Sequence, residues 1–281
     1  MTTTVRVRDL LAEAEQCLSA IETARLDAEV LLATSMDTDR ASLYAHPERA
    51  VSEDVVKNFN QLVRKREQQY PLAYLLGRKE FWSLDLAVNS HTLIPRPETE
   101  CLVETALSML PQGQKLEILE LGTGSGAIAL ALASERPDIR VLAVDLCEQA
   151  LYTASANAAR IGIENVGFLQ SDWFSNCPVR RFDMIISNPP YVESVHSGFI
   201  SGEIKHEPRL ALDGGKNGLE AIELLVPAAL AYLKAKASLL LEHGSTQAQG
   251  VRDIFASEVY EQIHTKQDYA GLDRLSYAQR P

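Results

Sequence analysis

The feature that most constrains the fold is a glycine-rich turn between an apolar run and a helix-like segment. Residues 116–121 are mostly apolar, Gly122, Gly124 and Gly126 follow, and residues 127–134 have helical character. Alternating glycines let the backbone turn sharply and let a ligand approach where a side chain would collide. A turn that only joins a strand to a helix does not need three of them. The motif therefore indicates a ligand site at the start of a helix.

Short apolar runs and helix-like segments continue to alternate after this turn. Strands are expected at residues 116–121, 141–145, 166–170, 184–187 and 238–242, and helices near residues 127–134, 148–160, 219–233 and 247–257. This alternation is typical of βαβ units around a mostly parallel sheet. Residues 260–279, which alternate around Gly271, predict a closing antiparallel hairpin. An α/β domain is therefore expected here.

The first part of the chain has a different pattern. Apolar residues recur at the spacing of one helix face between residues 10 and 63. Residues 80–89 alternate apolar with polar side chains, as in a β-hairpin, and Pro95 and Pro97 then exclude regular structure. The expected organisation is a helical bundle at residues 1–75, a β-hairpin linker at residues 76–98 and the α/β domain at residues 99–281.

The glycine turn fits two classes of cofactor. Gly122, Gly124 and Ala127 match a loose dinucleotide fingerprint. Asp145 ends the next strand about 20 residues later, where an acid accepts hydrogen bonds from ribose hydroxyls in either class. Glu120 favours S-adenosylmethionine over NAD, because it attracts the cationic amino and sulfonium groups and repels a pyrophosphate. The candidate cofactor-binding residues of the turn are Gly122, Thr123, Gly124, Ser125 and Gly126.

The turn after the strand at residues 184–187 carries a second motif, Asn188, Pro189, Pro190 and Tyr191. An amide or aniline-like –NH2 is a poor nucleophile because its lone pair is delocalised, so a site that methylates it has to hold both N–H bonds with acceptors. Asn188 supplies a side-chain carbonyl, and Pro189 supplies a main-chain carbonyl held by a rigid ring pair. Tyr191 offers an aromatic wall for a planar group and for a sulfonium cation. These are the candidate catalytic and substrate-binding residues.

The two motifs support each other because both are expected at the carboxyl edge of the sheet, where open α/β sheets bind ligands. Asp172 and Trp173 follow the third expected strand, where an acid and a ring can border an adenine. The alternative for Trp173 is a core position with a satisfied indole N–H. Asn188 is also expected to contact the cofactor. The six histidines show no metal-site spacing, so no metal is expected.

Charge and cysteine content limit the classes of binding partner and the cellular compartment that are expected. The net charge of −11 disfavours non-specific binding to a phosphate backbone, which needs clustered Lys and Arg. The densest basic run, residues 64–66, is interpreted as the solvated face of a helix. The four cysteines form no Cys-x-x-Cys pair and fit small buried thiols in a reducing cytosol. No apolar stretch resembles a signal peptide or a membrane span. We therefore expect a cytoplasmic protein without membrane or direct nucleic acid partners.

Several longer motifs carry a family resemblance. They are Pro-Leu-Ala-Tyr-Leu-Leu-Gly at residues 71–77, Glu-Phe-Trp-Ser-Leu at 80–84, Leu-Ile-Pro-Arg-Pro-Glu-Thr-Glu at 93–100, Gln-Ser-Asp-Trp-Phe at 170–174, Glu-Pro at 207–208 and Leu-Glu-His-Gly at 241–244. With the two motifs above, the chain resembles the release-factor glutamine methyltransferase family over nearly its whole length. The segment at residues 93–100 is the more specific one, because adenine methyltransferases share Asn-Pro-Pro-Tyr.

The resemblance implies a helical bundle, a β-hairpin and a Rossmann-like seven-stranded S-adenosylmethionine-dependent methyltransferase domain. It implies methylation of the side-chain nitrogen N5 of the glutamine in the Gly-Gly-Gln motif of class-I peptide chain release factors, with S-adenosyl-L-homocysteine as product. It places the cofactor against residues 122–126, Asp145, Trp173 and Asn188, and the glutamine against residues 188–191. The bundle would help to bind the release factor.

Other functions remain to be separated from this one. An adenine-N6 methyltransferase of DNA or RNA uses the same catalytic motif but needs a basic groove. A glutamine methyltransferase of a ribosomal protein would share the whole chemistry. An NAD-dependent oxidoreductase or a non-enzymatic nucleotide-binding module would leave Asn188 without a role.

Overall fold

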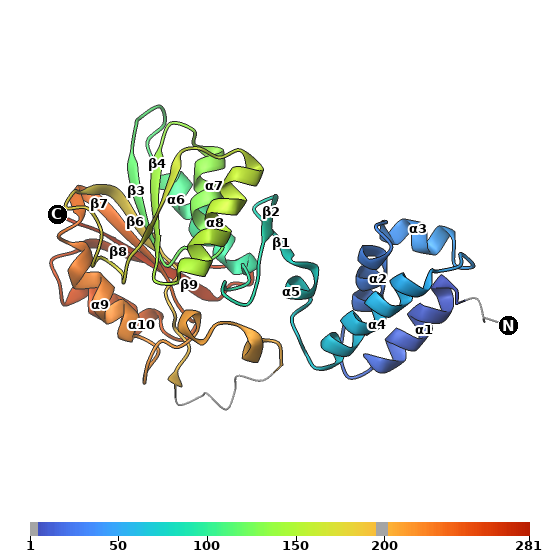
Figure 1. Ribbon diagram of the computed structural model, residues 1–281. Coiled ribbons are helices and arrows are strands. Elements are labelled where there is room, and N and C mark those ends of the chain that lie inside the picture. Colours follow the sequence, from blue (N-terminus) through green and yellow to red (C-terminus); the bar gives the residue numbers. More distant parts are fainter. Residues whose placement is uncertain (1–4, 195–201) are drawn as a thin grey trace. The chain divides into compact units, whose positions relative to one another are not determined.

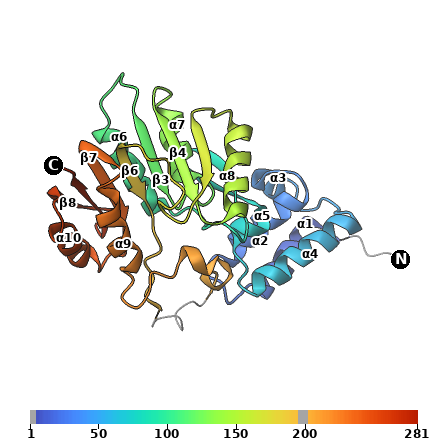
Figure 2. The same ribbon diagram turned by 60° about the vertical axis from the view of Figure 1, so that its left-hand side comes forward.

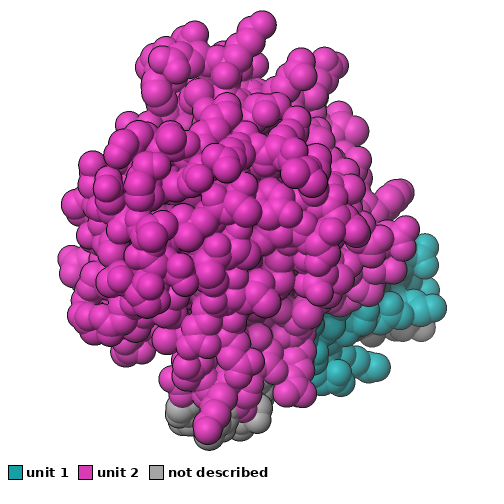
Figure 3. All heavy atoms as spheres, turned by 90° about the vertical axis from the view of Figure 1, so that its left-hand side faces the viewer, with its two compact units in different colours: residues 1–77, 201–206 teal, residues 78–200, 207–281 magenta. Residues whose placement is uncertain are grey.

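The computed structural model describes residues 5–194 and 202–281, which form two compact units (Figures 1 and 3). The smaller unit contains the described residues up to Gly77 together with residues 202–206. The larger unit contains residues 78–194 and the chain from Glu207 to Pro281. The chain therefore passes through the smaller unit twice.

The smaller unit is helical, as the apolar spacing predicts. Its helices are α1 (Val7–Cys17), α2 (Ala24–Ser35), α3 (Arg40–Ala45), α4 (Glu53–Glu67) and α5 (Leu72–Leu76). Their apolar faces form one core, in which Leu31 and Leu32 of α2 and Phe59 of α4 are at most 1% exposed. Periodic apolar residues on amphipathic helices account for this packing.

The basic run at residues 64–66 is only partly a solvated helix face, so that interpretation was wrong for Arg66. Arg66 is 4% exposed, and its Nε donates to Asp27 of α2 at 2.6 Å. A second guanidinium nitrogen lies 2.6 Å from the carboxylate of Glu203. A buried guanidinium requires such partners because an unpaired charge would lose its hydration.

Residues 202–206 pack against the helical unit through two further contacts. The ring of His206 lies 5.0 Å from that of Tyr70, centroid to centroid. Its Nε2 is 3.2 Å from the carbonyl oxygen of Gln68. With the ion pair between Arg66 and Glu203, these contacts explain why this short segment belongs to the helical unit.

The larger unit is built on a seven-stranded sheet, and the α/β prediction is confirmed. The strands are β3 (Glu117–Leu121), β4 (Arg140–Asp145), β5 (Val166–Gln170), β6 (Phe182–Ser187), β7 (Leu233–Glu242), β8 (Glu261–Gln267) and β9 (Asp273–Gln279). Their order in the sheet is β5-β4-β3-β6-β7-β9-β8. The first five are parallel, and β9 pairs antiparallel with β7 and β8, as expected for a closing hairpin.

Helices cover both faces of this sheet (Figures 1 and 2). The helices α6 (Glu100–Met109), α7 (Ala127–Glu135) and α8 (Glu148–Ile161) pack on one face, and α9 (Glu220–Ala229) and α10 (Ala248–Ala256) pack on the other. Successive strand residues alternate between the two cores: Ile118 belongs to the first and Leu119 to the second, and both are fully buried. The central strands β3 and β6 are buried over almost their whole length because both faces are covered.

The hairpin of β1 (Arg78–Phe81) and β2 (Leu84–Ala87) is part of the larger unit, which differs from the linker expected at residues 76–98. Phe81 and Leu86 are at most 1% exposed and lie in the core with α6 and α7. Asn157 of α8 exchanges two hydrogen bonds with the backbone of Ala87, at 2.7 and 3.0 Å. Buried side chains and paired backbone groups attach the hairpin to the sheet domain.

Two helices differ from the sequence expectations. The helix α6 was not predicted, although residues 101–106 are mostly apolar and buried. The helix expected at residues 219–233 ends at Ala229, since Leu233 already begins β7. In the part of the chain that the structure describes, no helix is long and apolar enough to cross a membrane.

Candidate active site

A cavity of about 480 Å³ lies at the carboxyl edge of the sheet, within the larger unit. Residues that follow β3, β4, β5 and β6 line it, so four separate loops meet there. The sheet order reverses direction next to β3, because the chain runs outward to β5 on one side and to β7 on the other. Ligand sites of open α/β sheets lie at this switch point.

The glycine turn between β3 and α7 has the backbone that its sequence requires. Gly122, Gly124 and Gly126 have φ angles of +73°, +56° and +86°, a region that favours glycine. A Cβ on Gly124 would meet nothing within 4 Å, whereas one on Gly126 would lie 3.1–3.2 Å from Leu130 and Ala154. Gly124 therefore leaves room for a ligand, and Gly126 lets the helix pack closely. Gly122, Thr123, Gly124 and Ser125 line the cavity; Gly126 does not.

Asp145 joins the end of β4 to the glycine turn. Its Oδ2 accepts from the backbone N–H of Gly124 at 2.8 Å, and its Oδ1 accepts from that of Cys147 at 2.9 Å. Burial raises the pKa of Asp145, while these two backbone N–H groups favour its charged form. Each carboxylate oxygen has a second lone pair, so Asp145 can still accept from ribose hydroxyls.

Glu120 is the buried acid of the cavity. It is 1% exposed, and its Oε2 accepts from the Thr123 hydroxyl at 2.6 Å. Its Oε1 has no hydrogen-bond partner among the residues that the structure describes. Burial raises the pKa of Glu120 to about 8. A cationic ligand group would satisfy the unpaired oxygen, so the site fits the amino end of S-adenosylmethionine better than a pyrophosphate.

Asp172 and Trp173 line the same cavity beyond β5. Trp173 is half-buried and has a positive φ of 47°, and its ring would lie 3.8 Å from a Cβ on Gly122. Asp172 is exposed. The ring is therefore a wall of the cavity beside the glycine turn, and contact with an adenine stays a prediction for both residues.

Asn188 and Pro190 bring the second motif to the cavity. Asn188 is half-buried, and its Nδ2 donates to the hydroxyl oxygen of Thr99, which also lines the cavity, at 3.3 Å. With Nδ2 engaged by Thr99, the side-chain carbonyl is the group left to accept hydrogen bonds from a substrate. Methylation of an –NH2 group needs an acceptor of this kind, and this role of Asn188 stays a prediction.

Pro189 and Tyr191 do not belong to the cavity lining. Pro189 is buried, and the Tyr191 hydroxyl donates to Oε1 of Glu242 at 3.3 Å. Burial raises the pKa of Tyr191, and the nearby Glu242 charge raises it further, so the hydroxyl stays protonated. The expected aromatic wall is thus tied to a buried acid at the end of β7. The catalytic roles of Pro189 and Tyr191 stay predictions.

Comparisons with known proteins agree with this geometry. Residues 9–77 match the model of the PrmC N-terminal domain, and residues 98–217 match that of the methyltransferase small domain. The chain is 44% identical to the release factor glutamine methyltransferase of Shewanella oneidensis over 93% of this chain and 91% of that protein. For those of Coxiella burnetii and Escherichia coli the identity is 42%, over 95% of this chain and 95% and 96% of the relatives. The chain belongs to the release factor glutamine methyltransferase family.

Solved structures support the fold alone. A methyltransferase from Pyrococcus furiosus matches with a TM-score of 0.53 at 19% identity, covering 70% of this chain and 88% of that one. The 16S rRNA N2 G1207 methyltransferase of T. thermophilus matches with a TM-score of 0.52 at 19% identity, covering 73% of this chain and 50% of that one. Both contain the sheet domain that a release factor glutamine methyltransferase shares with other methyltransferases.

Sequence reasoning missed the loop that supports the catalytic motif in this methyltransferase. Val192 and Gly214 are joined by a backbone hydrogen bond of 2.9 Å, and Val192 also donates to Leu212 at 2.8 Å. A Cβ on Gly214 would lie 2.7 Å from the Cα of Tyr191 and 2.8 Å from the carbonyl oxygen of Pro190. Gly214 therefore lets two backbone segments touch. The Gly-Gly pair at residues 214–215 was the available signal.

Two buried acids were also missed as site residues, although both lie in motifs of the family resemblance. Glu207 accepts from the backbone N–H of Ile94 at 3.1 Å and pairs with Arg96, and so fixes one wall of the cavity. Glu242, at the end of β7, is 1% exposed and contacts Tyr191. An acid at the end of an apolar run was the signal in the case of Glu242; Glu120, one residue before the end of β3, gave a similar signal.

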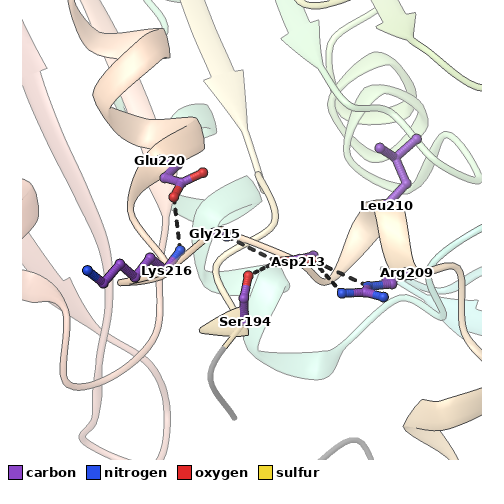
Figure 4. A pocket seen from close by; sticks show the side chains of 7 residues that line it. All are labelled: Ser194, Arg209, Leu210, Asp213, Gly215, Lys216 and Glu220. Atoms are coloured by element: carbon purple, nitrogen blue, oxygen red, sulfur yellow. Dashed lines mark hydrogen bonds and ion pairs between the residues drawn. The ribbon is translucent and has the colours of Figure 1, made fainter. Parts of the chain in front are cut away.

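A second pocket adjoins the mouth of the cavity and shares four residues with it (Figure 4). Asp213 accepts from the Ser194 hydroxyl and pairs with Arg209 at 3.3 Å, and Glu220 accepts from the backbone N–H of Lys216 at 3.0 Å. Leu210 is 58% exposed and lines both pockets. The described residues hold no cluster of three or more His, Cys, Asp or Glu side chains suited to a metal ion.

The buried Glu120 predicts a pH-dependent cofactor affinity. Because its pKa is about 8, the carboxylate is largely protonated at pH 6, and a cationic ligand has to displace that proton. The affinity for S-adenosylmethionine should therefore rise by up to about tenfold per pH unit between pH 6 and 8 and level off above. Isothermal titration calorimetry across this range measures the dependence.

Glu120→Gln should flatten this dependence, and Glu117→Gln serves as the matched control. Glu117 is on the same strand, pairs with Arg180 at 3.0 Å and does not line the cavity. The ligand's own amino group titrates equally in all three proteins, so only the difference between them counts. If the affinity of Glu120→Gln for S-adenosylmethionine depended on pH as steeply as that of the wild type, the proton displaced on binding would belong to another group.

Proposed function

We propose that this protein transfers a methyl group from S-adenosylmethionine to the side-chain amide nitrogen of the glutamine in the Gly-Gly-Gln motif of class-I peptide chain release factors. The observation that carries the proposal is Asn188, whose Nδ2 is held by Thr99 so that its carbonyl is left for an amide substrate. It lies in one cavity with the glycine turn and with the unpaired oxygen of Glu120. The names of relatives up to 44% identical support the glutamine and the release factor.

Different residues of the cavity would bind different parts of the cofactor. S-adenosylmethionine supplies, when bound, an electrophilic methyl group on its sulfonium, and S-adenosyl-L-homocysteine is left afterwards. The glycine turn at residues 122–126 would lie against the cofactor, and the carboxylate of Asp145 would accept from its ribose hydroxyls. Glu120 would hold the amino group. Trp173 and Asp172 would border the adenine, the ring through stacking and the acid through its amino group.

The catalytic turn has to make an amide nitrogen nucleophilic. Asn188 and the main-chain carbonyl of Pro189 would accept the two N–H bonds, which orients the lone pair away from both. No strong base is needed, because a nitrogen that has gained a methyl group is acidic and loses its proton afterwards. Catalysis then consists mainly of positioning and of polar stabilisation by fixed acceptors.

The net charge favours a protein substrate over the adenine of a nucleic acid. The charged side chains that line the cavity are one arginine, Arg96, and five acids: Glu120, Asp145, Asp172, Asp213 and Glu220. A net charge of −11 and this acidic lining oppose a phosphate backbone but suit a basic protein loop. We therefore propose release factors as partners, with the helical unit contributing to their binding, and the cytoplasm as the place of action. Direct nucleic acid binding has no part in the proposal.

Mass spectrometry of a treated release factor tests the proposed substrate. Incubation with this protein and S-adenosylmethionine should add one methyl group to the peptide that contains Gly-Gly-Gln. A release factor with Gly-Gly-Ala should gain none, because alanine has no side-chain amide. Equal methylation of that variant would exclude the glutamine. Parallel incubations with ribosomal proteins, DNA and RNA identify the rival substrates, since methylation of one of them alone would replace the release factor.

A further inference from the structure

Glu242 lies beside the catalytic turn without lining the cavity. It ends β7, and β7 pairs with β6 so that Leu241 is opposite Ser187, the residue before Asn188. The side chain is 1% exposed, and its Oε1 accepts from the Tyr191 hydroxyl at 3.3 Å. Its Oε2 is buried and has no hydrogen-bond partner among the described residues. A buried acceptor of this kind needs a donor nearby.

Thr99 is a donor with the right surroundings. It precedes α6, is 4% exposed, and its hydroxyl stabilises the charged form of Glu242 by hydrogen bonding. The same hydroxyl oxygen accepts from Nδ2 of Asn188 at 3.3 Å. Thr99 is thus hydrogen-bonded to the amide of Asn188 and lies close enough to Glu242 to favour its charged form.

The hydrogen-bond donors and acceptors of Glu242, Thr99 and Asn188 fit together in one arrangement. A carboxylate only accepts hydrogen bonds, and a threonine hydroxyl has a single proton to donate. If that proton is directed to Glu242, the hydroxyl oxygen can only accept from Asn188. The NH2 end of the Asn188 amide then faces Thr99, and its carbonyl end is left for the substrate.

We propose that Glu242 is a positioning residue, which fixes the orientation of the Asn188 amide through the hydroxyl of Thr99. The proposal rests on the proposed function, in which the Asn188 carbonyl accepts a hydrogen bond from the substrate amide. A protonated Glu242 would itself donate to Thr99. The Thr99 proton would then be free to turn toward Asn188 and favour the reversed amide.

The charges around Glu242 place its protonation near neutral pH. Burial and the Glu98 charge raise its pKa, whereas the Thr99 hydroxyl, Arg274 on β9 and the Tyr191 hydroxyl favour the carboxylate, and the resulting pKa is about 7. The next residue on the strand, His243, is hydrogen-bonded to Gly244 and Ser276, and burial lowers its pKa. Turnover at saturating cofactor should therefore rise with pH through about 7 and fall below it.

Three variants separate positioning from structural support. Glu242→Gln keeps the shape but adds donors, and Thr99→Val keeps the shape but removes the hydroxyl. Each should lower kcat about tenfold to a hundredfold, as outer partners of site residues do, with the cofactor Kd changed less than about threefold. The Glu242→Gln variant should also lose the rise of kcat through pH 7. Thr99→Ser, which keeps the hydroxyl, should recover most of the turnover lost in Thr99→Val.

Nuclear magnetic resonance of 15N-asparagine-labelled protein with S-adenosyl-L-homocysteine gives a readout without any release factor. The two Asn188 Nδ2 protons should be distinct and slowly exchanging above pH 7, and both features should weaken below pH 7 and in Glu242→Gln. Failure to methylate a release factor would refute the proposed function and leave this readout intact. An unchanged kcat–pH profile in Glu242→Gln, or Asn188 resonances that ignore pH and both substitutions, would overturn the positioning role.

Discussion

Asn188→Ala is expected to lower kcat by about two to three orders of magnitude, the loss seen when one fixed polar group is removed from an active site. Alanine removes the side-chain carbonyl that would accept from the substrate –NH2. The glycine turn, Asp145 and Glu120 are untouched. The cofactor Kd should therefore change by no more than a few-fold. Single-turnover kinetics and calorimetry measure the two quantities separately.

Asn176→Ala is the matched control for this experiment. Asn176 is exposed, donates to the carbonyl of Gln170 at 3.1 Å and does not line the cavity. Its replacement should leave both kcat and the cofactor Kd unchanged. If Asn188→Ala retained full turnover, Asn188 would have no part in catalysis. If it lost cofactor affinity and turnover equally, its role would be in cofactor binding.

Gly214→Ala should produce the second large loss, by a different route. The added methyl group would lie 2.7–2.8 Å from the Cα of Tyr191 and from two carbonyl oxygens, those of Pro190 and Gly218. These are backbone atoms, so the catalytic turn itself has to shift. A displacement of about 1 Å in a positioned group can cost about a hundredfold in rate. We expect kcat to fall by about this factor.

Gly167→Ala is the matched control: it adds the same methyl group at a position where that group causes no clash. Gly167 lies on β5, and an added Cβ would lie 4.0 Å from Leu142, an ordinary contact. This variant should keep wild-type kcat. Thermal unfolding of both variants shows whether Gly214→Ala loses activity because the protein is unfolded or because the catalytic turn is displaced. Normal turnover in a folded Gly214→Ala protein would mean that the loop at residues 214–218 does not position the catalytic turn.

The position of the glycine turn and of Asp145 at one edge of the sheet could be predicted because the signals are local. Gly122, Gly124 and Asp145 occupy the ends of adjacent strands, and their residue types follow directly from the backbone and hydrogen bonds required there. The alternation of strands and helices was equally readable, because each element carries its own apolar period. Helix α6 was missed because it lies between the expected linker, which ends at residue 98, and the first expected strand at residue 116, a stretch to which no element was assigned.

What could not be predicted depends on neighbours that are distant in the sequence. Tyr191 binds Glu242 because β7 lies next to β6, and the order of strands in a sheet is not contained in any local pattern. Arg66 is buried because Asp27 and Glu203 supply the compensating charges from remote positions. A basic run has the same appearance in a sequence whether its partners exist or not. Tertiary pairing decided both outcomes.

The double passage of the chain through the helical unit bears on how that unit could be removed. A fragment that starts at Arg78 would still contain Glu203 and His206, but it would lack Arg66, Gln68 and Tyr70, to which they bind. The segment thus released lies close behind Asn188 in the sequence. Anything that melts the helices, whether heat or a core substitution, would release that segment together with them. We therefore expect enzymatic activity to be lost at a lower temperature than the one at which the sheet unfolds. Comparing the temperature dependence of activity with the thermal unfolding of the sheet measures this difference.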